Sequence, residues 1–420
     1  MNPLRLLQVL HLSPLPISIT TTFIMFFCNS VYRNLLGRCI TSTSTSTSTS
    51  IRQTLLIDTD GGMDDLVAIA ALFQNHVLPS DDVTIASTGT HTPTQNSNLK
   101  TNFVSNERGS VPLDIPYIFT VGGMQNSPTH AARYIQTMFP HTNVIPGLVG
   151  QDIKNGVEKA PSWLKEARKS INNFEIEKLG LGTFVEDNDA KGDDAQRIEN
   201  KTNASRHVLT SFLRSQPDDS VDLLCLGPFT NVASWISDAT TRQLMEKKLR
   251  QIWVMGGNLP PSQNEPMPLP EFNFAQDVKA VHLVFSSPAF LKKMWVVPFQ
   301  TCGQTIEKQV WKKCLDGAQG TSNMVGKCLE WEGRYDAIRY DVMCAFGYVN
   351  SPYGAGKEGK NTHTIEWEEK SVWVDPATGL VREGASIDEK DIQGYPIKFV
   401  TWIEVLGRKG MLSWISYSLI

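Results

Sequence analysis

Four acidic residues that could hold a metal ion stand close together in the segment DTDGGMDD, residues 58–65. They are Asp58, Asp60, Asp64 and Asp65, and carboxylates this close repel one another unless a cation or solvent balances their charge. A cation explains them economically, and ligands that are all oxygen atoms favour a hard ion, Ca²⁺ or Mg²⁺, over zinc. The alternative is a solvated acidic turn that caps a helix.

The residues around this segment predict a strand, a loop and a helix. An apolar run, residues 54–57, precedes it, and DLVAIAALF, residues 65–73, continues with helical spacing. Ligands bind at the C-terminal ends of strands in open parallel sheets, and Gly61 and Gly62 let the backbone turn tightly at this point. The position therefore favours a metal site over a solvated turn.

Similar short apolar runs recur along the chain, each followed by a turn and a stretch that is compatible with a helix. They cover residues 83–87, 115–121, 221–227, 251–257 and 294–299. Strands this apolar, alternating with helices, predict an α/β fold with a single open, mainly parallel, Rossmann-like sheet that has helices on both faces. We expect one domain over residues 54–420, with a polar surface insertion around residues 185–203 that lacks apolar periodicity.

The composition excludes several classes of protein. A chain of 420 residues with 41% hydrophobic residues can bury a large core. The 39 Lys and Arg residues against 43 Asp and Glu residues give a net charge of -4, so no positive field attracts nucleic acid, and we expect no nucleic-acid partner. The seven Cys residues form no C-x-x-C pair and no cluster with His, which excludes a structural zinc module and leaves the disulfide status open.

Residues 1–53 are typical of a targeting leader followed by a Ser/Thr linker. No Asp or Glu occurs before Asp58, residues 15–28 are largely apolar, and residues 41–50 repeat Thr and Ser. The apolar stretch is too short and too rich in Thr for a membrane span, so we expect at most transient membrane contact through the leader. The sequons at Asn200 and Asn203 favour the secretory pathway or an extracellular location. Import into a plastid or mitochondrion, or a cytosolic protein with a misassigned start, are the alternatives.

Three known patterns begin like DTDGGMDD. An EF-hand loop fails because Gly62 occupies the third ligand position, and a haloacid-dehalogenase-type phosphatase needs Thr or Val where Gly62 stands. The third pattern, D-T-D-P-G-x-D-D, opens the inosine-uridine-preferring nucleoside hydrolase family. The segment resembles it at every position except Gly61, which replaces Pro. We expect that replacement to cost only local rigidity.

Four further blocks resemble the same family, in the family's order. They are CLGPFTNVA (225–233), WVMGGN with EFNFAQDVKA (253–258 and 271–280), RYDVMCAF (339–346) and VWVDPATGLVREG (372–384). Together the five blocks extend the resemblance over residues 54–405. The resemblance implies a nucleoside hydrolase fold and an enzyme that hydrolyses the N-glycosidic bond of ribonucleosides to ribose and free base.

Carried over by position, the resemblance implies a Ca²⁺ site. The carboxylates of Asp60, Asp65 and Asp341 and the backbone carbonyl of Leu226 would bind the ion, and Asp60 would also deprotonate the calcium-bound water. The ribose would be held by Asp64, Met255, Asn264, Glu271 and Asn273. Glycosidic cleavage passes through an oxocarbenium-like state, which an acidic pocket stabilises over the neutral substrate.

Several of these residues also have simpler explanations. Asn231 in PFTNVA is compatible with a helix cap, and Met255 in an apolar strand with a core position. Glu271 and Asn273 would face one side of a strand, where a surface pair is the default.

Two departures from the family pattern concern the pocket. Thr90 follows Gly89 where the family has Asn, and Tyr340 replaces the His that serves in many members as the acid for the leaving base. Purine-preferring members carry an aromatic residue at the second position, so Tyr340 predicts stacking on the base and a preference for purine nucleosides.

Two other functions stay open. A haloacid-dehalogenase-type phosphatase would need Asp58 as its nucleophile, and a catalytically weak nucleoside-binding or pentose-binding protein would explain the missing His. As partners we expect a small-molecule nucleoside and further copies of the chain in a homo-oligomer.

Overall fold

The structure is a computed structural model that describes residues 53–76, 113–125, 127–149, 169, 194–260, 271–302, 340–351, 365–384, 395–403 and 411. All of them belong to one compact unit, residues 51–420. Several predictions lie outside the described residues: nearly the whole leader and linker, the strand expected at 83–87, Thr90 and Asn264. None of the described helices is long and apolar enough to cross a membrane.

The N-terminal half alternates strands and helices. Its elements are β1 (Gln53–Thr59), α2 (Met63–His76), β2 (Leu113–Asp114), β3 (Tyr117–Thr120), α3 (Pro128–Met138), β4 (Asn143–Pro146), α6 (Asp194–Ser215), β5 (Val221–Cys225), α7 (Thr230–Ser237), α8 (Ala239–Lys248) and β6 (Leu249–Met255). The strand, loop and helix expected over residues 54–73 are therefore present.

The C-terminal half adds short helices and an antiparallel edge. Its elements are α9 (Phe272–Gln276), α10 (Val278–Phe285), α11 (Pro288–Leu291), β7 (Met294–Val297), α12 (Phe299–Cys302), α15 (Tyr340–Val349), β8 (Ile365–Val374), β9 (Val381–Glu383) and β10 (Tyr395–Ile403). The block at 372–384 forms the end of β8, a turn and β9, which pair as an antiparallel hairpin.

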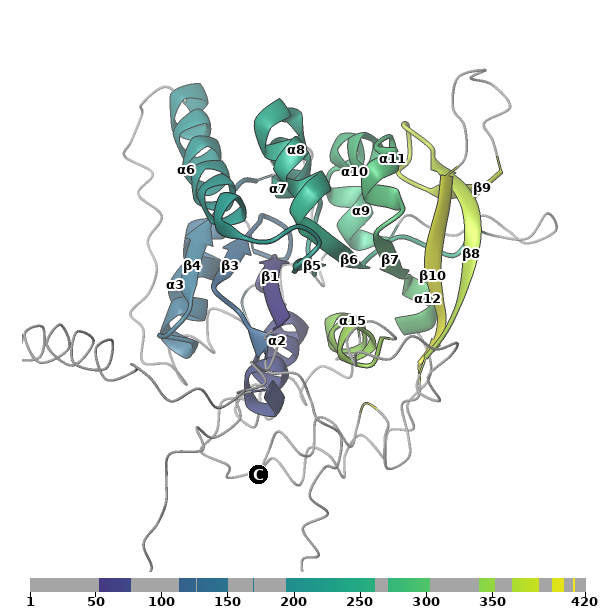
Figure 1. Cartoon of the computed structure of the whole chain (residues 1–420), viewed down its shortest axis with the longest axis horizontal. Helices are drawn as coiled ribbons and strands as arrows, with labels where there is room; N and C mark the ends of the chain where they lie inside the picture. The colour runs from purple at the N-terminus through teal and green to yellow at the C-terminus, as the bar shows by residue number, and fades with distance from the viewer. Residues whose placement is uncertain are drawn as a thin grey trace, which may run out of the picture. The chain divides into compact units, whose positions relative to one another are not determined.

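In the described part of the chain, ten strands form one sheet in the order β4-β3-β1-β5-β6-β7-β10-β8-β9, with β2 paired to β1. Every pairing from β4 to β10 is parallel, whereas β8 runs antiparallel to both β10 and β9 (Figure 1). The prediction of a single open, mainly parallel sheet is confirmed.

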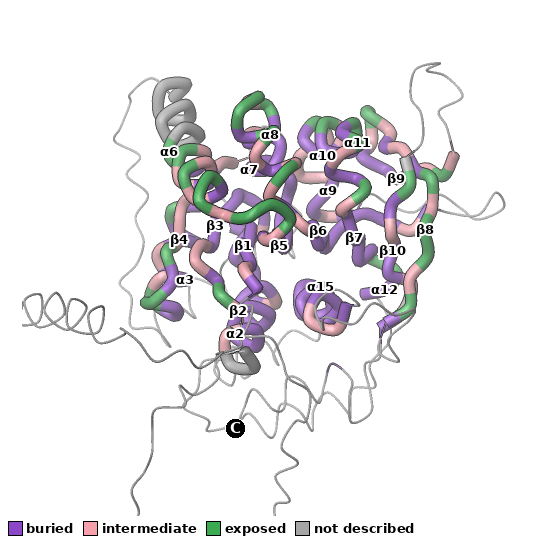
Figure 2. The backbone as a smooth tube through the Cα atoms, in the orientation of Figure 1, coloured by how far each residue is buried: buried purple, intermediate pink, exposed green. Residues whose placement is uncertain are grey.

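Helices cover both faces of this sheet. The apolar side chains of α2, α3, α12 and α15 pack against one face, and those of α6, α7, α8, α10 and α11 pack against the other (Figure 1). Along β1 the face alternates by residue, because Leu55 and Ile57 join the first cluster and Leu56 joins the second. Both faces of the central strands are therefore buried, which explains their continuous apolar sequence (Figure 2).

The polar insertion expected around residues 185–203 is only partly described. Residues 194–203 form the first part of α6, so this half of the segment is helical although its sequence lacks apolar periodicity. The helix continues to Ser215, where Leu209 and Leu213 are buried in the core. Packing of its C-terminal turns therefore anchors the helix, and its polar N-terminal turns extend it.

A buried carboxylate, Asp222, ties four elements together at the edge of the sheet where the parallel strands begin. Its side chain is fully buried and accepts hydrogen bonds from Gln53 Nε2 (2.5 Å), Tyr348 Oη (2.9 Å) and Arg250 Nη2 (2.5 Å). These partners come from β1, the end of α15 and the start of β6. Asp222 therefore fixes the C-terminal end of α15 to the sheet.

Removing this carboxylate should destabilise the protein. Asp222→Ala leaves the Arg250 cation and the Tyr348 hydroxyl without their buried acceptor, so the free energy of unfolding should fall by about 3–5 kcal/mol. Chemical denaturation measures this loss. Asp218→Ala is the control, because Asp218 is half-exposed and pairs with Lys247 and Lys248 at the surface. A midpoint that shifts equally in both variants would contradict the structural role of Asp222.

Candidate metal and active site

The loop after β1 places Asp60 between the end of the strand and the start of α2. Gly61 adopts a φ of +73°, and the Tyr134 hydroxyl donates a hydrogen bond to its carbonyl. Proline cannot adopt a positive φ, because its ring holds φ near −65°. This loop conformation therefore requires a residue that tolerates a left-handed backbone, and the expectation that Gly61 costs only local rigidity stays a prediction.

Backbone groups enclose the Asp60 side chain. Its carboxylate accepts hydrogen bonds from the N–H groups of Gly62 (3.1 Å) and Met124 (2.7 Å). A Cβ on Gly123 would lie 2.3 Å from Asp60 Oδ2, and one on Gly227 would lie 2.9 Å from the Asp60 nitrogen. The loops after β3 and β5 can approach Asp60 only because both positions are glycine.

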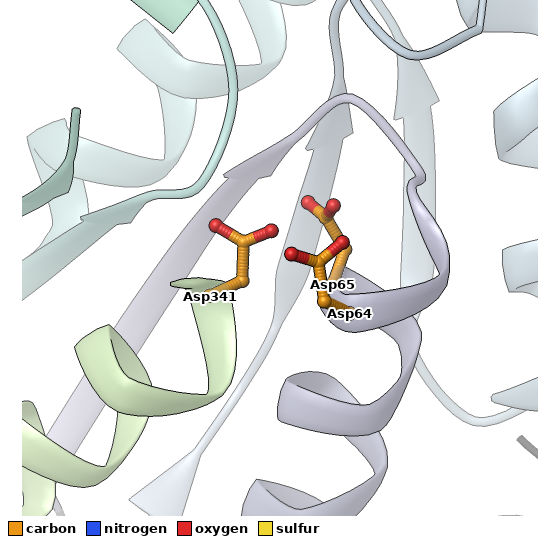
Figure 3. Close-up of side chains that lie close together, drawn as sticks. All are labelled: Asp64, Asp65 and Asp341. Atoms are coloured by element: carbon orange, nitrogen blue, oxygen red, sulfur yellow. The ribbon is translucent and has the colours of Figure 1, made fainter. Parts of the chain in front are cut away.

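Three carboxylates meet beside Asp60, at the N-terminal turns of two helices. Asp64 and Asp65 lie in the first turn of α2, and Asp341 lies in the first turn of α15. One carboxylate oxygen of each lies within 4.8 Å of the others, and Figure 3 shows the three side chains converging. The positive ends of both helix dipoles favour negative charge here.

Burial raises the pKa of each of these groups. Desolvation, opposed in part by the Met124 N–H, raises the pKa of Asp60 to about 6. Desolvation, then the charges of Asp60 and Asp64, raises the pKa of Asp65 well above its usual value. The pKa of Asp341 is raised in the same way, by desolvation and then by the charges of Asp65, Asp64 and Asp60. Without a cation, burial and mutual repulsion therefore disfavour the ionised forms of these carboxyl groups.

The donor set fits a hard divalent cation. Asp341 Oδ1 is buried and has no hydrogen-bond partner among the described residues. An unpaired carboxylate oxygen in the interior is costly, whereas metal coordination satisfies it. The ligating atoms available at this point are all carboxylate oxygens, which suit Ca²⁺ or Mg²⁺.

Glu271 caps a helix instead of lying on a surface strand. It is 7% exposed and accepts hydrogen bonds from the N–H groups of Asn273 (2.9 Å), Phe274 (3.1 Å) and Gly257 (3.0 Å). Desolvation outweighs these bonds and raises the pKa of Glu271 to about 7. The simpler explanation of Glu271 and Asn273 as an exposed strand pair is therefore wrong, because both are buried at the start of α9.

Asn273 joins two strand ends. Its Nδ2 donates to the carbonyl oxygens of Leu226 and Met255, each at 3.2 Å. Met255 is 3% exposed and belongs to the core cluster beneath α2 and α15. The Leu226 carbonyl, expected to bind the ion, thus already accepts one hydrogen bond and keeps one lone pair for a second partner.

Tyr340 begins α15 directly before Asp341. Its ring stacks on Phe299 of α12, with ring centroids 5.7 Å apart and an interplanar angle of 17°. Cys302 Sγ donates to the Tyr340 carbonyl at 3.6 Å. Phe299 and Cys302 of α12 therefore help to hold the turn that carries Asp341.

Asn231 has a role that sequence reasoning missed. The N-cap of α7 is Phe229, so the cap explanation of Asn231 is wrong. Its Nδ2 donates to Asp58 Oδ1 (2.8 Å) and to the Thr120 carbonyl (3.0 Å), and its Oδ1 accepts from Leu148 N–H (2.9 Å). A fully buried amide here connects β1, β3 and α7. Its place in the G-P-x-T-N block was the only signal in the sequence.

Asp58 lies behind the site in β1. It is 1% exposed, and desolvation, opposed by the Asn231 hydrogen bond, raises its pKa to about 8. A carboxyl group that keeps its proton at neutral pH is a poor nucleophile. This geometry disfavours the phosphatase that would need a nucleophilic Asp58.

Known structures share this fold. A plant nucleoside hydrolase superposes with a TM-score of 0.54 at 16% identity, over 87% of this chain and 98% of that one. The inosine-uridine preferring nucleoside hydrolase from Bacillus anthracis gives a TM-score of 0.51 at 16% identity, over 88% and 100%. A purine-preferring ribonucleoside hydrolase from Gardnerella vaginalis gives 0.51 at 14% identity, over 87% and 98%.

The family is identified by sequence. No curated protein matches the chain. The model of the inosine-uridine preferring nucleoside hydrolase family, however, matches residues 55–391, which include every block around the carboxylates and the α9 cap. With this match and the shared sheet, the chain belongs to the inosine-uridine preferring nucleoside hydrolase family and is a hydrolase that acts on N-glycosyl bonds.

Proposed function

We propose that this chain hydrolyses purine ribonucleosides to ribose and free base in a Ca²⁺-dependent reaction. One observation carries the cation: Asp64, Asp65 and Asp341 meet within 4.8 Å in a buried place where Asp341 Oδ1 has no partner among the described residues. The residues that would hold the ion are Asp60, Asp65, Asp341 and the Leu226 carbonyl, with Asp64 beside them.

In this proposal Asp60 acts as the proton acceptor beside the bound cation. A bound cation of this class supplies a Lewis acid that lowers the pKa of a water molecule. Asp60 is placed to accept the proton of the attacking water, because its pKa of about 6 leaves it largely ionised at pH 7. Two N–H groups hold its carboxylate in one orientation.

The acidic surroundings favour the transition state over the substrate. As the glycosidic bond breaks, positive charge develops on the ribose. A carboxylate about 4 Å away gains about 4 kcal/mol from such a charge at an effective dielectric of 20, and gains nothing comparable from the neutral nucleoside. We assign Asp64, Glu271 and Asn273 to the ribose hydroxyls, with Met255 against the sugar.

The aromatic residues next to Asp341 support a preference for purines. Tyr340 and Phe299 form a nearly parallel pair at the start of α15. An aromatic ring stacks more strongly on the larger face of a purine than on a pyrimidine. A pyrimidine leaves poorly without a positioned acid, and Tyr340 replaces the His that supplies one in many family members.

A catalytically weak binding protein is the second candidate function. Asp60 would then keep its place in the site but turnover would be absent. Release of ribose from inosine, adenosine or uridine by the purified protein distinguishes the two, because only the hydrolase releases sugar.

Calcium binding should require the clustered carboxylates. Asp65→Ala removes one of the proposed ligands, so the remaining carboxylates should no longer bind the ion. Calorimetric titration should then show no Ca²⁺ binding, and nucleoside hydrolysis should be lost. Circular dichroism should show the wild-type fold. Asp218→Ala, which removes a half-exposed carboxylate outside the site, should bind Ca²⁺ normally. Full activity of Asp65→Ala in chelator would refute the metal assignment.

The effect of Ca²⁺ on thermal stability should increase with pH. In the fold the pKa values of Asp60, Glu271 and Asp58 are about 6, 7 and 8, against ordinary values of 3.8, 4.5 and 3.8. Between about pH 4 and pH 8 the cation-free folded chain therefore binds more protons than the unfolded chain, so its stability falls as the pH rises. Ca²⁺ binds the ionised form and should offset this loss.

Differential scanning calorimetry measures how the Tm changes with pH in chelator and in Ca²⁺. The Tm in chelator should decrease from pH 5 to pH 8, and the gain in Tm on adding Ca²⁺ should grow over the same range. Asp65→Ala should show no gain at any pH. A Tm that rises with pH in chelator would show that these carboxyl groups are not desolvated.

The preference for purines should depend on the aromatic pair that Tyr340 forms with Phe299. The wild type should cleave inosine well above uridine, and Tyr340→Ala should lower kcat for inosine more than it raises KM, because the aromatic interaction acts in the transition state. Stacking accounts for about a tenfold effect at most. Steady-state kinetics with both nucleosides measure it. Equal rates on inosine and uridine in the wild type would reject the stacking mechanism.

A further inference from the structure

Phe299 is the most exposed large hydrophobic side chain among the described residues, at 47% exposure, and Leu283 of α10 follows at 40%. A single exposed hydrophobic side chain needs no explanation by itself. Phe299 differs from Leu283 because it lies at the edge of the sheet where the acidic site is built. It is the first residue of α12 and follows the C-terminal end of β7 after one proline.

Backbone hydrogen bonds tie Phe299 to the proposed ribose site. Its N–H donates to the Gly257 carbonyl at 3.0 Å, and the Gly257 N–H donates to Glu271 Oε2 at 3.0 Å. Only one residue, Gly257, therefore separates Phe299 from the carboxylate that we assign to the sugar. The backbone of Phe299 therefore lies beside the turn after β6 whose Gly257 also binds Glu271, next to the proposed sugar site.

The two rings of the aromatic pair differ in what they still expose. Tyr340 is half-buried and packs against the core cluster that includes α2 and α15, in addition to stacking on Phe299. Phe299 is exposed, so it is the ring of the pair with more surface left for a ligand. The planes differ by 17°, so a planar group lying on the exposed side of Phe299 would extend a nearly parallel stack.

We propose that Phe299 is the residue that contacts the nucleobase and sets the preference for a purine. Tyr340 is then a positioning residue that supports the Phe299 ring from behind. This assignment rests on the proposed function, because it takes a ribonucleoside as the ligand of the acidic site. It gives a role to the exposed ring that stacks on Tyr340, the residue directly before Asp341.

Binding of nucleosides that cannot be hydrolysed tests the assignment separately from catalysis. In 9-deazainosine and in pseudouridine a carbon–carbon bond joins base and ribose, so an N-ribohydrolase cannot cleave them. Calorimetric titration in the presence of Ca²⁺ gives the purine-to-pyrimidine affinity ratio. We would compare the wild type with Phe299→Ala, Phe299→Leu, Phe299→Tyr, Tyr340→Ala and the control Leu283→Ala.

Phe299→Ala should weaken 9-deazainosine binding about two- to tenfold and pseudouridine binding less. Phe299→Leu keeps apolar bulk without a π face and should behave like Phe299→Ala, whereas Phe299→Tyr should restore the wild-type ratio. Tyr340→Ala should lower the ratio by less than Phe299→Ala does. Leu283→Ala should match the wild type, because Leu283 is also an exposed hydrophobic residue but lies on α10, which packs on the face of the sheet opposite to α12 and α15.

The assignment is overturned if Phe299→Ala keeps the wild-type ratio, or if Tyr340→Ala alone abolishes it. Kinetics with inosine and uridine separate this failure from failure of the proposed function. A wild type that binds both C-nucleosides and cleaves neither inosine nor uridine refutes the hydrolase, while the binding ratios still decide the role of Phe299. A wild type that binds neither C-nucleoside refutes both.

Discussion

Buried negative charge that no positive side chain of the described residues balances is the constraint on which the site depends. Asp60, Asp64, Asp65 and Asp341 gather at one sheet edge, and the ion pairs between described residues all lie elsewhere. Backbone N–H groups and two helix N-termini lower the cost only in part, because desolvation still raises each pKa. The remaining charge calls for a divalent cation, beside which we propose that Asp60 acts as the proton acceptor.

Asp222, another buried carboxylate of the sheet, shows the contrast. Asp222 lies where the parallel strands begin and has Arg250 as its own cation, together with Gln53 and Tyr348 as donors. It is satisfied by the chain alone and therefore serves structure. Helix α15 connects the two places, since its first turn carries Asp341 and its last turn carries Tyr348. Asp222, which has its own cation and donors, thus fixes the C-terminal end of α15. The N-terminal end of the same helix carries Asp341, whose charge the described residues do not balance.

The topology explains why the site forms at this edge. From β1 the sheet continues to β3 on one side and to β5 on the other, and their connections pass over opposite faces. The loops after these strands diverge and leave room at the strand ends. Glycines at 123 and 227 let two of these loops reach Asp60, and Asn231 links β1 to β3 beneath it.

The sequence by itself determined the strand, loop and helix around Asp60, the mainly parallel sheet and the family, because apolar runs, glycines and motif order are local properties of the chain. It also named Asp64, Asp65 and Asp341 as candidates. The resemblance also predicted that Asp341 reaches the same ion as Asp60 and Asp65. Only the tertiary structure decided that Glu271 caps a helix, that Asn231 joins two strands and that Tyr340 already has Phe299 as a partner. Each of these contacts joins residues through the packing of separate elements, and the free energy of that packing depends on the whole core, which no short stretch of sequence contains.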